Sequence, residues 1–72
     1  MDLLTAELGR VYTVSRVSVD DPDMEAFLFS LGCYAGEAIT VVSRLKGGRI
    51  VSIKDGRYMI DSQLAAAIGI SA

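Results

Sequence analysis

The stretch from Leu28 to Val42, LFSLGCYAGEAITVV, contains the point at which a helical pattern gives way to a strand pattern. The apolar residues before it follow the i, i+3, i+4, i+7 spacing of one helical stripe, and they are Met24, Phe27, Leu28 and Leu31. Gly32 can take the left-handed conformation that ends a helix, and Gly36 is a second permissive position before alternation begins at Ile39. The sequence therefore predicts a helix with its stripe on the core, a tight turn and a strand.

The start of this helix is also marked. Asp21 can cap the free backbone amides, and Pro22 suits the first helical position because its missing N–H costs nothing there. Asp23 and Glu25 complement the positive end of the helix dipole. A helix turns by about 100° per residue, which places Phe29 on the face opposite the stripe. Phe29 is therefore predicted to point away from the main core.

Four strands are predicted, at about residues 10–19, 38–45, 49–54 and 57–61. The apolar alternation of the first one slips near Ser15 and Arg16, which predicts a bulge or sharp bend. Leucines before Gly9 are expected to form an entry turn that packs on the core, and they are Leu3, Leu4 and Leu8. The pattern indicates one mainly β domain over residues 1–72, a small and strongly bent antiparallel barrel with one or two short helices.

Two hairpin turns and a last helix complete the expected order. Residues 46–49 contain paired glycines and residues 54–57 contain Asp-Gly, which are typical of two-residue turns with positive φ. Asp61 or Ser62 can cap a short helix, and Gly69 is predicted to end it.

Composition restricts the possible functions. A chain of 72 residues buries only about 60% of its unfolded surface, and the 51% hydrophobic share leaves apolar groups for a partner. The absence of histidine and the single cysteine, Cys33, argue against catalysis, an internal disulfide and a resident cofactor. No leader or membrane segment is recognised, so a cytoplasmic location is expected. Residues 1–37 carry two basic and seven acidic side chains, whereas residues 38–72 carry five basic and two acidic ones.

The segment SLGCYAGEAITVV, with the glycine turn, the IVSI strand and the closing hairpin that follow it, resembles the ferrous iron transport protein A (FeoA) family. The resemblance runs from Leu8-Gly9 to about Ile70, although Ala35 stands where members usually place proline. It implies an SH3-like barrel and a non-enzymatic accessory role in bacterial ferrous iron uptake. The implied partner is the membrane GTPase permease called ferrous iron transport protein B. The chain would be associated with the membrane only through this partner.

The residues expected to contact this partner lie at the helix–strand junction, and they are Phe29, Cys33, Tyr34 and Glu37. Exposed aromatic side chains contribute disproportionately to protein interfaces. For Phe29, cover by other apolar segments of the chain is the alternative. For Cys33, the alternative is a small apolar side chain that fills a turn, because one thiol without imidazoles makes a poor metal site. Weak self-association is also possible.

A metal-sensing regulatory module, like the SH3-like domains of iron-dependent repressors, is the second hypothesis. Its weak candidate ligands are Asp20, Asp21 and Asp23. An EF-hand loop that begins at Asp21 would have glycine at its sixth position and glutamate at its twelfth. The chain has Ala26 and Gly32 there, so that motif is excluded. Helix capping explains the same carboxylates without a metal.

Nucleic-acid binding is the third hypothesis, since basic side chains gather on the predicted hairpins, at Arg44, Lys46, Arg49, Lys54 and Arg57. Stacking partners are scarce there, because only Tyr58 is near and its position in the alternation favours the core. Solvated turn residues that deter edge-to-edge aggregation explain the charges, and no nucleic-acid partner is expected.

Overall fold

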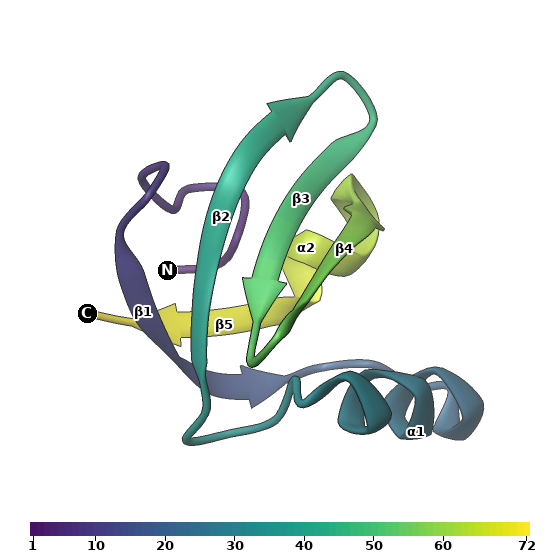
Figure 1. Ribbon diagram of the computed structural model, residues 1–72. Helices are drawn as coiled ribbons and strands as arrows, with labels where there is room; N and C mark the ends of the chain where they lie inside the picture. Colours follow the sequence, from purple (N-terminus) through teal and green to yellow (C-terminus); the bar gives the residue numbers. More distant parts are fainter.

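The computed structural model describes residues 1–72 and contains one five-stranded antiparallel sheet with two short helices. The elements in chain order are β1 (Val11–Val17), α1 (Pro22–Leu31), β2 (Ala38–Leu45), β3 (Gly48–Ile53), β4 (Gly56–Asp61), α2 (Ser62–Ala67) and β5 (Ile68–Ser71). The strands lie in the order β4-β3-β2-β1-β5, and the sheet curls so that α2 lies behind β3 and β4 (Figure 1). The mainly β fold predicted from the sequence is confirmed.

The core is built from alternate positions of the strands, because every second side chain of a strand points to the same face. Its buried members are Leu3, Ala6, Tyr12, Val14, Leu28, Cys33, Ile39, Val41, Val51, Ile53, Ile60, Ala65, Ile68 and Ile70. No polar or charged side chain is fully buried. Val17 and Val19 pack on the margin of this core, as the slipped alternation of the first predicted strand requires.

Two irregularities bend the sheet. The register between β1 and β5 shifts between Val14 and Arg16, which confirms the predicted bulge. A second shift, between Val41 and Ser43 in the β2–β3 pair, was not predicted. Such insertions increase local twist and let a short sheet curl around its own core.

Both hairpin turns lie where they were predicted, but the predicted role of their glycines is wrong. The two-residue loops are Lys46–Gly47 and Lys54–Asp55, and the only positive φ in either belongs to Lys54, at 52°. Gly48 and Gly56 instead begin the returning strands. A Cβ at Gly48 would collide with the carbonyl oxygen of Ile60, so close packing rather than turn conformation requires that glycine.

The end of the chain differs from the prediction. Asp61 caps α2, as expected, with its Oδ1 accepting from the amide of Leu64 at 2.7 Å. However, the helix ends at Ala67, and residues 68–71 form β5 on β1, so Gly69 is a strand residue and not a helix terminator. Two buried isoleucines, Ile68 and Ile70, supply the core side of this fifth strand.

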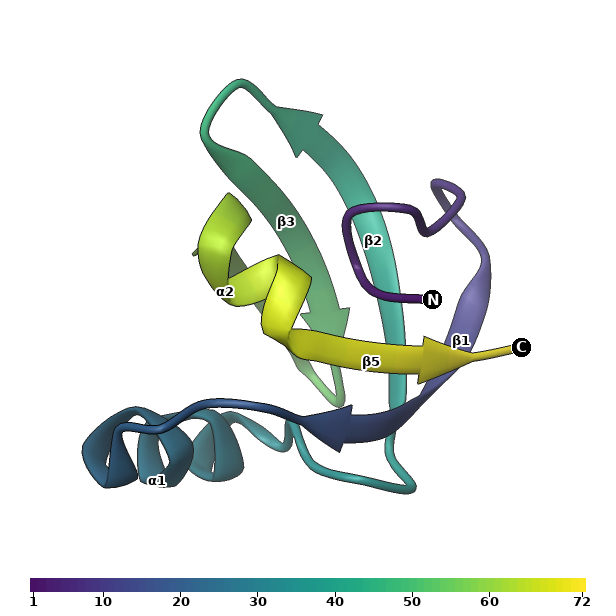
Figure 2. The ribbon, with the colours of Figure 1, turned by 180° about the vertical axis from the view of Figure 1, so that it is seen from behind.

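The first residues of the chain run along β5 (Figure 2). The Leu3 amide donates to the carbonyl of Ile68, and the Ile70 amide donates to the carbonyl of Met1. Leu3 is fully buried as predicted, whereas Leu8 is 48% exposed. Arginine side chains fix the same segment, because Arg44 and Arg49 donate to the carbonyls of Ala6 and Leu4.

Helix α1 projects from one end of the barrel (Figures 1 and 2). Its caps agree with the prediction, since the Asp21 carboxylate accepts from the Asp23 amide and Gly32 closes the helix at φ 92°. The predicted stripe does not lie on the core as a whole, because only Leu28 is buried. Met24 and Phe27 are 37% and 52% exposed. No helix of the chain is long and apolar enough to cross a lipid bilayer.

Candidate functional site

The junction between α1 and β2 is held by backbone hydrogen bonds on both sides. The amides of Gly32 and Cys33 donate to carbonyls of the last helical turn, which closes α1. The Gly36 amide donates to the carbonyl of Val14 at 2.9 Å, and the Val14 amide donates to the carbonyl of Glu37 at 2.8 Å. The turn is therefore pinned to the middle of β1, and the side chains that it carries have fixed positions.

Glycine is required at both bends of the junction. Gly32 and Gly36 have φ values of 92° and 94°, a region that side-chain-bearing residues rarely adopt. At Gly32 a second restriction applies, because an added Cβ would lie 2.9 Å from Cε of Lys54. Gly36 has open space around it and needs only the backbone conformation.

Phe29 and Tyr34 form an aromatic pair on the surface of this junction. Their rings stack with centroids 4.7 Å apart and planes 28° from parallel. Phe29 is 62% exposed, as predicted from its place opposite the stripe, so other apolar segments of the chain do not cover it. The pair lines a pocket of about 180 Å³ with Val17, Glu25, Cys33 and Ala35. The sequence prediction thus identified three side chains that the fold brings together.

A lysine from the β3–β4 turn completes the site. Nζ of Lys54 lies 3.1 Å from Oε2 of Glu37 and 5.8 Å from the centre of the Tyr34 ring. The hydrogen bond from Lys54 lowers the pKa of the Glu37 carboxyl, and the same bond raises the pKa of Lys54. Glu37, the fourth predicted contact residue, is therefore paired within the chain, and we name Phe29, Tyr34, Glu37 and Lys54 the junction patch.

Cys33 differs from the other predicted contact residues because its side chain is only 2% exposed. Burial raises the pKa of the thiol, which keeps it protonated and a poor nucleophile or metal ligand near neutral pH. Its place in the core supports the alternative stated above, a small apolar side chain that fills the turn. Any effect of Cys33 on a partner would act through the position of the junction patch above it.

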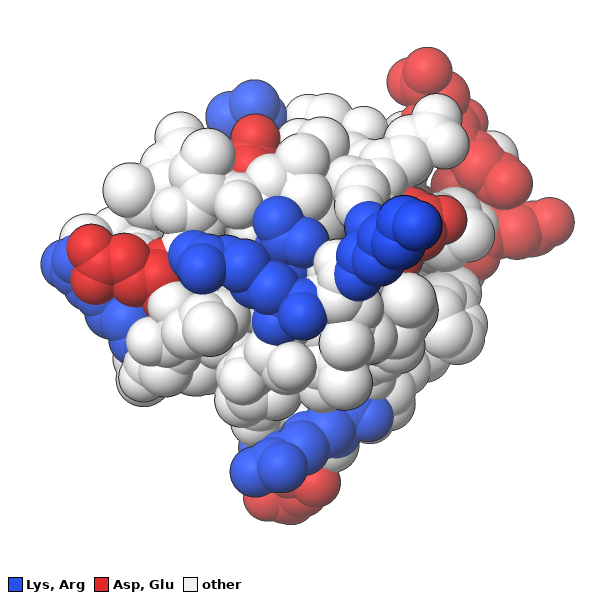
Figure 3. All heavy atoms as spheres, turned by 90° about the horizontal axis from the view of Figure 1, so that it is seen from above, with Lys and Arg blue, Asp and Glu red and all other residues white.

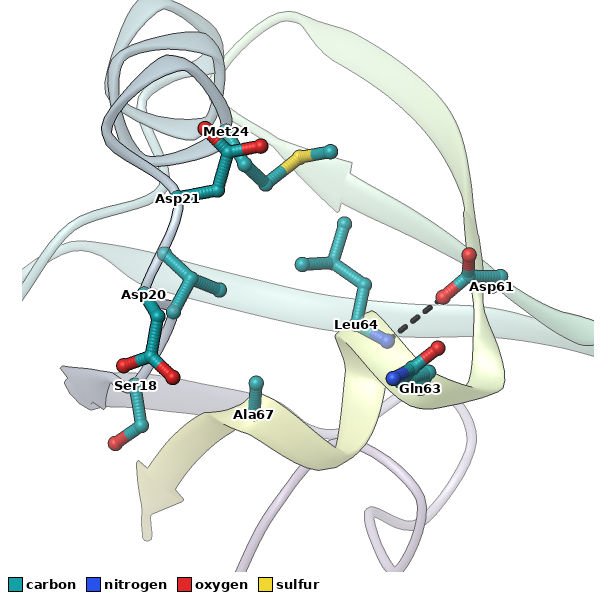
Figure 4. A pocket seen from close by; sticks show the side chains of 9 residues that line it. Ser18, Asp20, Asp21, Met24, Asp61, Gln63, Leu64 and Ala67 are labelled. Carbon is teal, nitrogen blue, oxygen red and sulfur yellow. Dashed lines mark hydrogen bonds between the residues drawn. The ribbon is translucent and has the colours of Figure 1, made fainter.

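The predicted metal candidates do not form a metal site. Asp21 is engaged as the α1 cap, and its neighbour Asp20 points to a different side of the chain (Figure 4). Asp20 and Asp21 line a pocket of about 320 Å³ between the start of α1 and α2, whereas Asp23 lies outside its lining. No group of three or more Asp, Glu, Cys or His side chains is placed to hold a metal ion. The pocket itself was not predicted, because it joins the segment before and within the start of α1 to the distant segment around α2.

Three of the basic side chains of the hairpins bind other groups of the same chain. Arg44 and Arg49 bond the carbonyls of the N-terminal segment, and Lys54 pairs with Glu37. Positive groups occupy the middle of the face that carries the tip of the β2–β3 hairpin. The largest gathering of negative groups lies at the end that carries α1, and smaller ones lie at the other margins (Figure 3). The charge asymmetry of the sequence therefore persists in the folded chain.

Sequence reasoning missed the exposure of two residues on the face of α1 opposite Phe29, Met24 and Phe27. It assigned them to the core because they share a stripe with Leu28. No sequence signal distinguished them, because they share the apolar stripe with Leu28, which is buried.

Comparison with known proteins gives the following similarities. The family model of the FeoA domain matches residues 1–72. The solution structure of iron(II) transport protein A from Clostridium thermocellum is 19% identical with a TM-score of 0.87, and the match covers 99% of this chain and 44% of that one. A crystal structure of an iron uptake regulatory protein (FeoA) is 22% identical with a TM-score of 0.84, covering 99% and 95%.

A manganese-dependent transcriptional repressor is also similar, at 27% identity and a TM-score of 0.87. The match covers all of this chain and 41% of the repressor, so this chain spans less than half the length of two of the three structures. The comparison with curated proteins gave no match. These likenesses identify the curled five-stranded sheet as a small SH3-like barrel.

Proposed function

The chain belongs to the FeoA domain family, and from this premise we propose that it is a non-catalytic accessory protein of ferrous iron uptake. In this proposal it acts in the cytoplasm and docks onto the GTPase region of ferrous iron transport protein B. The permease binds the nucleotide and carries the iron. The chain would influence assembly of the complex or the GTPase cycle through contact alone.

The exposed aromatic pair of the junction patch is the observation that carries this proposal. Phe29 is 62% exposed although it stacks on Tyr34, so the pair presents a rigid apolar surface to solvent. Aromatic anchors of this kind dominate the energetics of protein interfaces because they lose little side-chain entropy on binding. Met24 and Phe27 are exposed on the opposite face of α1 and are not part of this surface.

The non-catalytic part of the proposal draws support from the side-chain chemistry. The chain has no histidine, and its one thiol is buried with a raised pKa. The carboxylates near the larger pocket include two helix caps, Asp21 and Asp61, whose oxygens already accept backbone amides. None of these groups forms a pair of nucleophile and base.

An NMR titration of the ¹⁵N-labelled chain with the isolated GTPase domain of ferrous iron transport protein B tests the docking. We expect shifts at residues 27–37, and we expect Phe29→Ala to weaken binding by about tenfold or more, as for an aromatic anchor. Leu8→Ala is the matched control, because Leu8 is a comparably exposed apolar residue on the N-terminal segment. Unchanged spectra at high concentration would refute the proposal, as would shifts confined to the basic hairpins.

Regulation by a metal-sensing domain is the second candidate, and the likeness to the manganese-dependent repressor favours it. Its ligands would be oxygens near Asp20 and Asp21. Anaerobic addition of ferrous ion separates the two functions, because metal binding would broaden the amides around Asp21 locally by paramagnetic relaxation. We expect those amides to stay sharp, since the carboxylates do not converge on one point.

A further inference from the structure

The two edge strands of the sheet, β5 and β4, differ in how far other backbone covers them. At β5, the backbone of Met1 to Leu3 bonds to Ile68 and Ile70 and covers part of the edge. At β4, no backbone hydrogen bond outside the strand ladder involves residues 56–61. Figure 1 shows β4 on the outer margin of the sheet with α2 behind it. An edge strand with free amides and carbonyls is a template for pairing with another strand.

The hydrogen-bond pattern tells which backbone groups of β4 are free. The Ser62 amide donates to the carbonyl of Gly47 at 3.1 Å, one step beyond the pair of Asp61 with Gly48. Bonded and non-bonded pairs alternate along an antiparallel ladder. Ile60, Tyr58 and Gly56 therefore direct their amides and carbonyls toward β3. The amides and carbonyls of Arg57 and Met59 face outward, and so does the amide of Asp61. The Asp61 carbonyl, as the N-cap of α2, already accepts the first helical amide and keeps one lone pair.

The side chains of these same three residues lie on the outer face of the sheet, because Ile60 and Tyr58 point to the core. Arg57 and Asp61 are exposed, and Met59 is 56% exposed. The one salt bridge of the chain joins Lys54 and Glu37, so neither charge on β4 has an ion-pair partner in the chain. The pattern reads positive, apolar, negative at every second position.

We propose that β4 pairs antiparallel with β4 of a second copy of this chain, about a two-fold axis at Met59. In this register the two Met59 side chains face each other, and each Arg57 faces Asp61 of the other copy. The Met59 amides and carbonyls pair with each other, the Asp61 amide donates to the carbonyl of Arg57, and the Arg57 amide uses the remaining lone pair of the Asp61 carbonyl. Asp61 accepts the α2 amide through Oδ1, which leaves Oδ2 for the guanidinium.

A second copy fits this edge better than an arbitrary extended segment, because the antiparallel register places the positive Arg57 of each copy opposite the negative Asp61 of the other. Opposite charges across a strand pair are favourable, and like charges are unfavourable. Three residues from each copy make a short contact, whereas stable interfaces bury roughly 1,200 Å² or more, so we expect a weak dimer that forms at about 0.1–1 mM. This inference does not depend on the proposed docking to the permease.

Sedimentation equilibrium and ¹⁵N spectra of the whole chain from micromolar to millimolar concentration test the pairing. We expect reversible dimerisation, with shifts and slower hydrogen exchange at the amides of Arg57, Met59 and Asp61. Arg57→Glu should weaken dimerisation by about tenfold or more, because two ion pairs become two repulsions. Lys46→Glu makes the same charge change on the β2–β3 loop and should leave dimerisation unchanged.

Met59→Pro distinguishes strand pairing from a looser surface contact. The Met59 amide points outward, so proline removes no β3–β4 bond, and edge strands tolerate proline at such positions. We expect a folded chain that remains monomeric, with the fold checked by its amide spectrum. A wild-type chain that is monomeric at millimolar concentration would overturn the proposal. So would dimerisation that shifts residues 27–37 instead, or that survives both β4 variants.

Discussion

Lys54 lies in the turn between β3 and β4 and reaches across to the junction. Its stem packs over Gly32, where a Cβ would lie 2.9 Å from Cε, and its ammonium group contacts both Glu37 and Tyr34. Lys54 also has a φ of 52°, unusual for a residue with a side chain. One side chain thus links the second hairpin to both Glu37 and Tyr34 at the junction.

The first prediction concerns the pH dependence of this contact. The Lys54 hydrogen bond lowers the pKa of Glu37 in the folded chain, so its stabilising effect is present above the unfolded pKa and is lost as pH falls through the folded value. An NMR titration of the Glu37 side-chain carbons should show a midpoint below the ordinary glutamate value.

The variant Lys54→Met keeps most of the stem and removes the charge. We expect the Glu37 midpoint to rise toward its ordinary value in this variant, and the stability difference between the two proteins to vanish once Glu37 is protonated. A midpoint that is the same in both proteins would show that the ion pair does not form in solution.

Helix α1 is attached to the barrel by few side chains. Leu28 is its one buried residue, and the other three members of the apolar stripe are partly or largely exposed. The helix is instead defined by its ends, with Asp21 and Pro22 at the start and Gly32 at the close. Strong caps hold a short helix that has little tertiary support.

The second prediction compares two neighbouring residues of α1. Leu28→Ala removes a fully buried side chain and should lower the free energy of unfolding by about 2–4 kcal/mol. Phe29→Ala removes a larger side chain that is mostly exposed, and should cost less than about 1 kcal/mol through the lost stacking on Tyr34.

Urea unfolding followed by circular dichroism measures both variants. Equal losses would mean that Phe29 is covered in solution, and the junction patch would then not be available to a partner.

For the whole molecule, closure of the sheet depends on the last residues of the chain. β5 pairs with β1 in a register that runs from Thr13 with Ser71 to Val17 with Ile68. The first residues of the chain then bond to β5 from its other side. Both ends of the chain therefore meet at one edge of the barrel, while α1 extends from another part (Figures 1 and 2).

The third prediction follows from this arrangement. Amides in the central strands β2 and β3 should exchange with solvent only through global unfolding, because both strands are paired on each side. Amides of α1 should exchange at least about tenfold faster, since opening the helix exposes one buried side chain. Native-state hydrogen exchange measured by NMR checks the order. Equal protection in α1 and β3 would indicate that the helix and barrel unfold as one unit.

The sequence by itself determined the features that depend on neighbouring residues. Both caps of α1, the N-cap of α2, the places of the two hairpin turns and the bulge near Ser15 follow from side chains within a few positions of each feature. The exposure of Phe29 was also predicted, because its angle to Leu28 on the helix is set by local geometry. Local hydrogen bonding, steric limits and alternation act over such distances, so the printed order of residues is enough.

Only the tertiary structure decided the features that depend on residues far apart in the chain. β5 was missed because Ile68 to Ser71 is too short to show alternation and becomes a strand only beside β1. Met24 and Phe27 were assigned to a core that does not extend over them. Gly48 is required by the approach of Ile60, and the Glu37–Lys54 pair joins positions 17 residues apart. Burial and contact depend on which segment packs opposite, and that information belongs to the folded chain as a whole.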